Sequence, residues 1–176
     1  MTTERPNATT MRGNPLTLMG PELHPGDKAP AFTARTLDLK LFTLDDTKGK
    51  IRLFSAVPSL DTPVCDAETR RFNVEASKLG DKVEIVTISM DLPFAQKRWC
   101  AAAGIDKIRL VSDYFDRSFS QAYGTLIKEL RLSSRAIFVV DGQNTIRYVE
   151  YVHEVADHPD YEKALAAVKF LLDANP

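Results

Sequence analysis

Apolar runs that suit buried strands alternate with helical segments through most of the chain. The strand-like runs are IRLFSAV (51–57), VEIVTISM (83–90) and IRLVSD (108–113), and each is followed by a segment with helical spacing. Short apolar runs of this kind are typical of strands that are buried on both faces. The alternation predicts a largely parallel central sheet that helices cover on both faces, and a hairpin near the end of the chain adds an antiparallel edge.

The two ends of the chain carry different signals. Residues 1–12 are polar and aperiodic, which predicts a flexible N-terminal arm, and short strand-like pieces from Asn14 to Leu44 predict hairpins. Near the other end, residues 141–144 (DGQN) mark a hairpin turn between two strands, and an amphipathic helix is expected from about Pro159 to Ala174. We therefore expect an α/β protein with a thioredoxin-like fold, in which residues 13–176 form a single domain. An N-terminal β-hairpin preamble would precede a central mixed sheet flanked by helices.

Size and charge restrict the kinds of function that this chain can have. With 176 residues and 44% hydrophobic content, it can enclose one substantial core. The 23 basic and 24 acidic residues nearly balance, so no basic surface for nucleic acid is expected. No apolar run approaches the roughly 18–20 residues that span a membrane, and the N-terminus lacks the apolar core of a signal peptide. We expect a cytoplasmic protein without nucleic-acid or membrane partners.

The chain has two cysteines and three histidines, and their spacing does not match a structural zinc site. Two cysteines do not make a disulfide scaffold, and the cytosol keeps structural disulfides reduced. Each thiol is therefore considered by itself.

Cys65 lies a few residues beyond the carboxyl end of the 51–57 strand, at the edge of an α/β sheet where ligands commonly bind. Thr62 suits the N-cap of a helix and Pro63 suits its first position, which places Cys65 in the first helical turn. Unpaired N–H groups and the helix dipole stabilise a thiolate at this place. The position therefore favours a reactive thiol.

Helical spacing supports a second reading of Cys65, as a small residue of the core. The cysteine shares an inward face with a set of mostly apolar residues: Thr69, Phe72, Ala76 and Leu79. Buried free cysteine is common as a core residue, and the neighbouring Asp61 and Asp66 oppose ionisation of the thiol. Position and spacing alone leave both readings open.

Several motifs together carry a family resemblance. Pro58, Thr62 and Cys65 form the pattern P-x-x-x-T-x-x-C, and RRFN, DLPFAQKRWC, QAYG, SSRAIFVVD and PDYEKALAAVK follow in order. This set resembles the thiol peroxidase subfamily of the peroxiredoxins over about residues 13–172. The resemblance implies the peroxiredoxin variant of the thioredoxin-like fold and a peroxidase that needs no metal or haem cofactor.

The resemblance also implies a role for each motif residue. Cys65 would be the peroxidatic thiolate, which attacks the O–O bond of hydrogen peroxide or a small organic hydroperoxide and becomes a sulfenic acid. Pro58 would shield it, and Thr62 would hydrogen-bond the peroxide. Arg135 would pair with the thiolate, although an arginine before a strand is usually solvated when considered alone. Arg70 and Arg71, which are closer in sequence, are expected to be helix-surface charges.

Cys100 lies near the carboxyl end of the helix expected at 93–104, where the helix dipole raises the pKa of a thiol. Alone, it reads as an incidental half-exposed cysteine. The resemblance implies the resolving cysteine, which forms an intramolecular disulfide with Cys65 that thioredoxin then reduces, and it also implies a homodimer. Cysteines on successive crossover helices are expected to be too far apart for a disulfide in the reduced state, so we expect residues 62–71 to unwind.

Two other function classes are alternatives to the peroxidase. A thioredoxin-type disulfide reductase needs the motif C-x-x-C, whereas Asp66, Ala67 and Glu68 follow Cys65. A thioredoxin-like binding domain with inert thiols has no motif of its own. Turnover of peroxide that depends on Cys65 separates the peroxidase from this last class.

Overall fold

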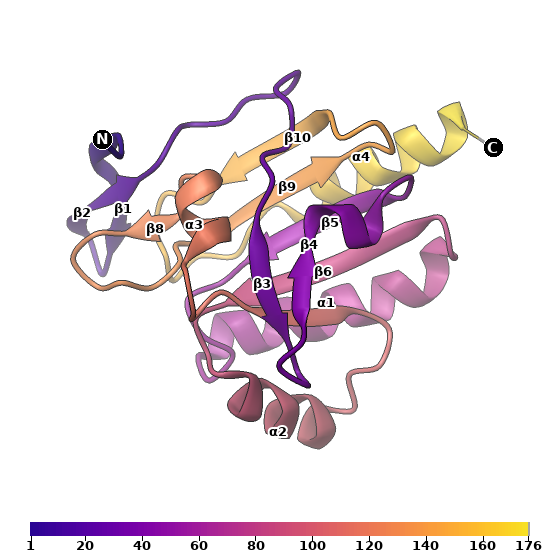
Figure 1. Cartoon of the computed structure of the whole chain (residues 1–176), viewed down its shortest axis with the longest axis horizontal. Helices are drawn as coiled ribbons and strands as arrows, with labels where there is room; N and C mark the ends of the chain where they lie inside the picture. The colour runs from indigo at the N-terminus through magenta and orange to yellow at the C-terminus, as the bar shows by residue number, and fades with distance from the viewer. Residues whose placement is uncertain (176) are drawn as a thin grey trace.

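The computed structural model describes residues 1–175, which form two β-sheets with helices packed against the larger one (Figure 1). The strand order is β10-β9-β5-β6-β7-β3-β4 in the larger sheet and β1-β2-β8 in the smaller. The strands are β1 (Glu4–Met11), β2 (Asn14–Met19), β3 (Thr33–Thr36), β4 (Leu41–Thr43), β5 (Ile51–Ala56), β6 (Val83–Ser89), β7 (Arg109–Ser112), β8 (Leu126–Ile127), β9 (Ala136–Val140) and β10 (Ile146–Tyr151). The helices are α1 (Pro63–Leu79), α2 (Pro93–Ala103), α3 (Ser118–Ala122), α4 (Tyr161–Ala174) and the short 3-10 helix η1 (Leu44–Thr47).

The larger sheet is mixed, as expected, but it is parallel only at its centre. β5 pairs in parallel with β6, and β6 with β7. β9 joins β5 and β3 joins β7 in the antiparallel direction. The other strands are antiparallel: the hairpin of β9 and β10, predicted from the turn at residues 141–144, forms one edge, and the hairpin of β3 and β4 forms the other. The parallel part of the sheet is therefore limited to three strands.

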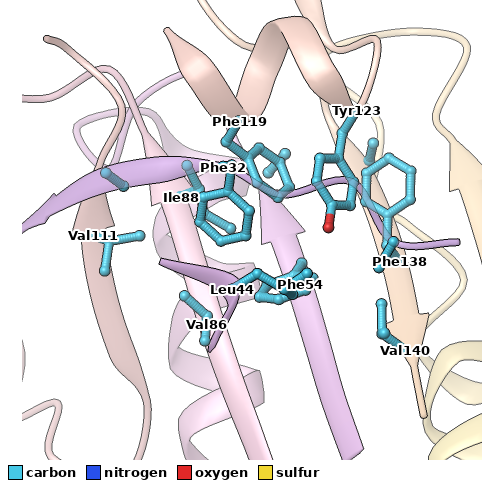
Figure 2. Close-up of a cluster of buried hydrophobic side chains, with 14 of the residues drawn as sticks. Phe32, Leu44, Phe54, Val86, Ile88, Val111, Phe119, Tyr123, Phe138 and Val140 are labelled. Carbon is cyan, nitrogen blue, oxygen red and sulfur yellow. The ribbon is translucent and has the colours of Figure 1, made fainter. Parts of the chain in front are cut away.

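Side chains on the central strands alternate between two cores. On β9, Phe138 and Val140 contact one cluster, while Ile137 and Val139 contact the other. Helices α1 and α4 cover the second face, behind the strands in Figure 1. Figure 2 shows the first cluster, in which aromatic rings from α3 and from neighbouring strands and loops pack together. This packing holds the central strands in place, so their ends form a rigid support for loops.

Residues 4–11 form strand β1, so the prediction of a flexible arm over residues 1–12 is wrong for this segment. The strand pairs with β2 through the turn at Arg12 and Gly13, both of which have positive φ. Its polar side chains bind main-chain oxygens: Arg5 Nε donates to the Gly20 carbonyl at 3.1 Å, and Thr9 Oγ1 to the His153 carbonyl at 2.9 Å. A strand held by such bonds lacks the apolar pattern that identifies a strand in a sequence.

The register of β5 with β9 determines where the candidate site residues meet. Ala56, the last residue of β5, lies opposite Ala136, the first residue of β9. Because the two strands are antiparallel, the residue before β9 lies beside the segment that leaves β5. This places Arg135 next to the loop that leads to Cys65.

Candidate active site

Cys65 lies in the first turn of α1 and is fully buried, with 0% of its surface exposed. Thr62 is the N-cap and Pro63 opens the helix, as the sequence predicts. The expected inward face is confirmed, since Thr69 and Phe72 are also buried. The thiol therefore lies both at a helix start and inside the protein. These are the features of the two alternatives that the sequence left open, a reactive thiol and a small core residue.

Arg135 lies against Cys65 although 70 residues separate them in sequence. Its Nη2 atom donates to Cys65 Sγ at 3.2 Å, and its Nε atom donates to the carbonyl of Val155 at 3.0 Å. Burial lowers the pKa of this guanidinium, but the adjacent Glu68 carboxylate and Cys65 thiol more than offset that effect and leave the pKa above its ordinary value. Arg135 therefore presents a fixed positive charge to the sulfur.

Glu68 is a site residue that the sequence reasoning missed. Its carboxylate accepts from Arg135 Nη1 at 2.5 Å and from Ser55 Oγ at 2.8 Å, and none of its surface is exposed. Burial raises the pKa of this carboxyl group, and the bonds from Arg135 and Ser55 counteract that rise in part. The spacing could have indicated this role, because a residue three positions after Cys65 lies on the same inward face of the helix.

Pro58 and Thr62 lie in the loop between β5 and α1. Pro58 is buried, whereas Thr62 is exposed and its hydroxyl donates to the carbonyl of Ser59 at 2.8 Å. Asp91, just after β6, fastens this loop: its carboxylate accepts from Ser59 Oγ at 2.7 Å and from the backbone N–H of Leu60 at 2.8 Å. The loop is therefore tied to the end of the neighbouring strand.

Cys100 lies in the last turn of α2 and is half-buried, and both cysteines are free thiols. It belongs to the same hydrophobic cluster as Cys65, and its thiol donates to the carbonyl of Ile105 at 3.1 Å. Burial, and secondarily the Asp106 carboxylate, raise the pKa of this thiol. Together with Asp106 and Arg109, Cys100 lines a cleft of about 670 Å³. A molecule in that cleft approaches Cys100, whereas Cys65 lies within the protein.

Residues 66–71 belong to the range 62–71 that is expected to unwind, and ion pairs hold them both at the surface and in the core. Arg70 and Arg71 are surface charges, as predicted, in ion pairs with Asp66 and Glu162. Glu68, in contrast, is buried against Arg135. Unwinding of this segment therefore has to break a buried ion pair, and it stays a prediction.

Neither a metal site nor a membrane-spanning helix is found over residues 1–175. No cluster of three or more His, Cys, Asp or Glu side chains in this range is arranged to hold a metal ion. None of the helices in the same range combines the length and apolar character that a membrane crossing requires.

A sheet of this topology with a buried thiol at the start of α1 defines a thioredoxin-like protein of the redoxin class. The family model described as Redoxin matches residues 24–165. The chain is 58% identical to a thiol peroxidase of Halalkalibacterium halodurans, over 93% of this chain and 98% of that protein. It is 54% identical to a thiol peroxidase of Bacillus subtilis, over 93% of this chain and 97% of that protein.

A solved structure supports the same assignment. The crystal structure of a peroxiredoxin-like protein from Aquifex aeolicus superposes with a TM-score of 0.88 at 36% sequence identity, and the match covers 97% of this chain and 98% of that one. With relatives this similar over nearly their whole length, the chain belongs to the thiol peroxidases of the Redoxin family.

Proposed function

We propose that this chain reduces hydrogen peroxide and small organic hydroperoxides, with Cys65 as the peroxidatic thiol. The observation that carries the proposal is the 3.2 Å contact between Arg135 Nη2 and Cys65 Sγ inside a buried site. A fixed guanidinium beside the sulfur stabilises a thiolate, and it also stabilises negative charge that develops on the peroxide oxygens during attack. Both effects favour the chemistry of a thiol-dependent peroxidase.

In the first step the Cys65 thiolate attacks the terminal oxygen of the peroxide. A sulfur–oxygen bond forms, the O–O bond breaks, and the leaving oxygen takes a proton to become water or an alcohol. Cys65 is thereby oxidised by two electrons to the sulfenic acid, and the peroxide is reduced by two. The proton comes from solvent, and the peroxide is the only oxidant that this step needs.

Thr62 and Pro58 are proposed to assist this step. The Thr62 hydroxyl donates its hydrogen bond to the Ser59 carbonyl, so its lone pairs are available to accept a hydrogen bond from the peroxide. The buried ring of Pro58 would limit the access of water to the sulfur. Asp91 would hold the loop that carries both residues.

In the second step Cys100 attacks the sulfenic sulfur, releases water and forms a disulfide with Cys65. A dithiol protein, proposed to be thioredoxin in the cytoplasm, then reduces this disulfide by exchange. The cleft beside Cys100 supports this assignment, since it gives an outside thiol a path to that sulfur.

A homodimer is proposed as the assembly. The side chains of Leu92, Phe94 and Phe115 are 51%, 67% and 61% exposed. They follow the carboxyl ends of β6 and β7, which are parallel neighbours, so they come after the same end of these two strands. Exposed apolar side chains at this end of the sheet support an interface with a second copy. Sedimentation of wild type and of Phe94→Ser tests it, and a wild-type monomer would refute it.

Reductant consumption tests the peroxidase. With thioredoxin, its reductase and cumene hydroperoxide, the wild-type protein is expected to consume reductant continuously. Cys65→Ser is expected to consume none. Cys100→Ser should complete a single oxidation of Cys65 without further turnover. After one equivalent of peroxide, the non-reduced wild type should lose the mass of about two hydrogens, with Cys65 linked to Cys100. Persistent turnover in Cys65→Ser would exclude the assignment.

Arg135→Lys tests the guanidinium separately. Lysine keeps the charge but loses the planar fork that reaches Cys65 and Glu68 together. The rate constant for Cys65 oxidation should fall about 100-fold, on the scale of removing one stabilising donor. The matched control is Arg70→Lys on the helix surface, which should oxidise at the wild-type rate.

A further inference from the structure

The N-terminal hairpin of β1 and β2 contacts the loop that follows β10. Thr10 exchanges backbone hydrogen bonds with this loop: its N–H donates to the His153 carbonyl at 2.8 Å, and its carbonyl accepts from the Val155 N–H at 2.9 Å. Thr9 Oγ1 adds a bond to His153 at 2.9 Å. The hairpin and the loop are therefore joined as if they continued a sheet.

Val155 connects this junction to the candidate active site. Its N–H is bound by Thr10, and its carbonyl accepts from Arg135 Nε at 3.0 Å. The same guanidinium reaches Cys65 Sγ through Nη2. A single residue thus lies between the hairpin and the arginine. A shift of the Val155 carbonyl changes the acceptor that orients the guanidinium.

Glu154 fastens the junction from outside. Its carboxylate accepts from Thr10 Oγ1 at 2.6 Å, from the Arg12 N–H at 2.9 Å and from the Gly13 N–H at 3.1 Å. These three donors all belong to the tip of the hairpin, and Glu154 directly precedes Val155. The carboxylate therefore determines how closely the hairpin holds the Val155 peptide.

We propose that Glu154 is a positioning residue for the peroxidase reaction, which clasps the N-terminal hairpin onto Val155 and thereby orients Arg135 toward Cys65. The proposal rests on the proposed function of Arg135 and adds to it a role for a segment far from the cysteine. The hairpin then supports the active site through Val155 and Arg135.

The chain offers a matched control for Glu154. Glu129 is an exposed carboxylate that also accepts a backbone N–H of the hairpin, that of Thr17, with both oxygens at 3.0 Å. It binds β2 at Thr17, whereas the hydrogen bonds of the Val155 peptide go to Thr10 and Arg135. The side chain of Val155 packs with Leu18 of β2 and Ile127 of β8, so both variants act on the same hairpin. Glu154→Gln and Glu129→Gln therefore remove the same charge from the same hairpin, and only the first acts on the loop that orients Arg135.

The experiment measures the rate of Cys65 oxidation by peroxide and the pH midpoint of Cys65 alkylation by iodoacetamide, in the Cys100→Ser background. Glu154→Gln is expected to slow oxidation about three- to tenfold, well short of losing the arginine itself, and to move the alkylation midpoint to higher pH. Thr10→Val, which removes one of the three donors without a charge change, should shift both in the same direction. Glu129→Gln should change neither.

Amide hydrogen exchange at Val155 makes each outcome decisive. If the Val155 amide loses protection in Glu154→Gln while oxidation and alkylation remain as in the parent, the hairpin does not orient Arg135 and the proposal is overturned. If the Val155 amide keeps its protection in Glu154→Gln, Glu154 does not hold the hairpin against Val155, and the proposal is also overturned. Failure of the peroxidase assignment is recognised separately, because the parent protein would then consume no peroxide.

Discussion

Trp99 Nε1 donates a hydrogen bond to Asp66 Oδ1 at 3.0 Å, and this bond joins the helix of Cys100 to the first turn of the helix of Cys65. Arg70 strengthens the link, since it pairs with Asp66 at 2.8 Å and its guanidinium lies 5.7 Å from the centre of the Trp99 ring. The two helices that would have to rearrange for a disulfide are therefore fastened to each other beside the thiols.

Trp99→Phe should accelerate formation of the disulfide. The substitution keeps the aromatic ring and the pair of Asp66 with Arg70, but it removes a bond to a carboxylate worth about 1 kcal/mol at this partly exposed place. Disulfide formation should therefore become about fivefold faster, with an unchanged rate of sulfenic acid formation. Rapid acid quench and mass analysis measure both steps. An unchanged disulfide rate would show that this link does not limit the rearrangement.

The pH dependence of the second step should follow Cys100. Burial and then Asp106 raise the pKa of this thiol, so the thiolate is a minor form near neutrality and its fraction increases about tenfold for each pH unit below that pKa. Disulfide formation should accelerate as the pH rises. Asp106→Asn should move the profile to lower pH, because it removes a negative charge near the sulfur.

Asp81→Asn is the control for this profile, since Asp81 lines the same cleft as Asp106 but does not contribute to the raised pKa of Cys100. Stopped-flow measurement from pH 6 to pH 10 distinguishes the variants. If Asp106→Asn leaves the pH profile of disulfide formation unchanged, burial alone raises the pKa of Cys100.

Asp91→Ala should loosen the loop before Cys65. The carboxylate accepts from Ser59 Oγ, the Leu60 N–H and Ser89 Oγ, so the substitution leaves three donors without their partner. We expect the free energy of unfolding to fall by about 2 kcal/mol and the oxidation of Cys65 to slow. Urea denaturation and peroxide kinetics measure the two effects. Asp61→Ala, an exposed carboxylate of the same loop, should change neither quantity.

Acid should release the hairpin through Glu154. Hydrogen bonds from Thr10 and from the Gly13 and Arg12 amides lower the pKa of this carboxyl to about 2. A carboxyl group whose pKa is lower in the folded state stabilises that state. This contribution is fully present at pH values above the unfolded-state pKa of about 4.3, and it is lost as the pH falls toward 2. The Arg12 and Gly13 amide resonances should titrate in this window. In Glu154→Gln they should not, and an identical titration there would assign the effect to another group.

The local features around the thiol were predictable from the sequence because they depend on neighbouring residues. Thr62 as N-cap, Pro63 at the first helical position and Cys65 in the first turn follow from capping preferences, and the structure confirms them. The same holds for the strands β5, β6 and β9, whose apolar runs are buried on both faces. These elements carry their own signal.

The polar elements were missed because their stability comes from contacts across the chain. β1 is held by hydrogen bonds to Gly20 and His153, and Glu68 is buried only because Arg135 and Ser55 satisfy its carboxylate. A polar residue reads as surface unless its partner is known, and these partners lie up to 144 positions away.

The sequence by itself determined the fold class, the place of Cys65 at a helix start and, through its motifs, the family. The tertiary structure decided what surrounds the thiol. The antiparallel register of β5 with β9 brings Arg135 to the sulfur, and the fold encloses Glu68 with it. Capping and periodicity are local properties of a chain, whereas the environment of a buried charge depends on which distant segments the sheet places side by side.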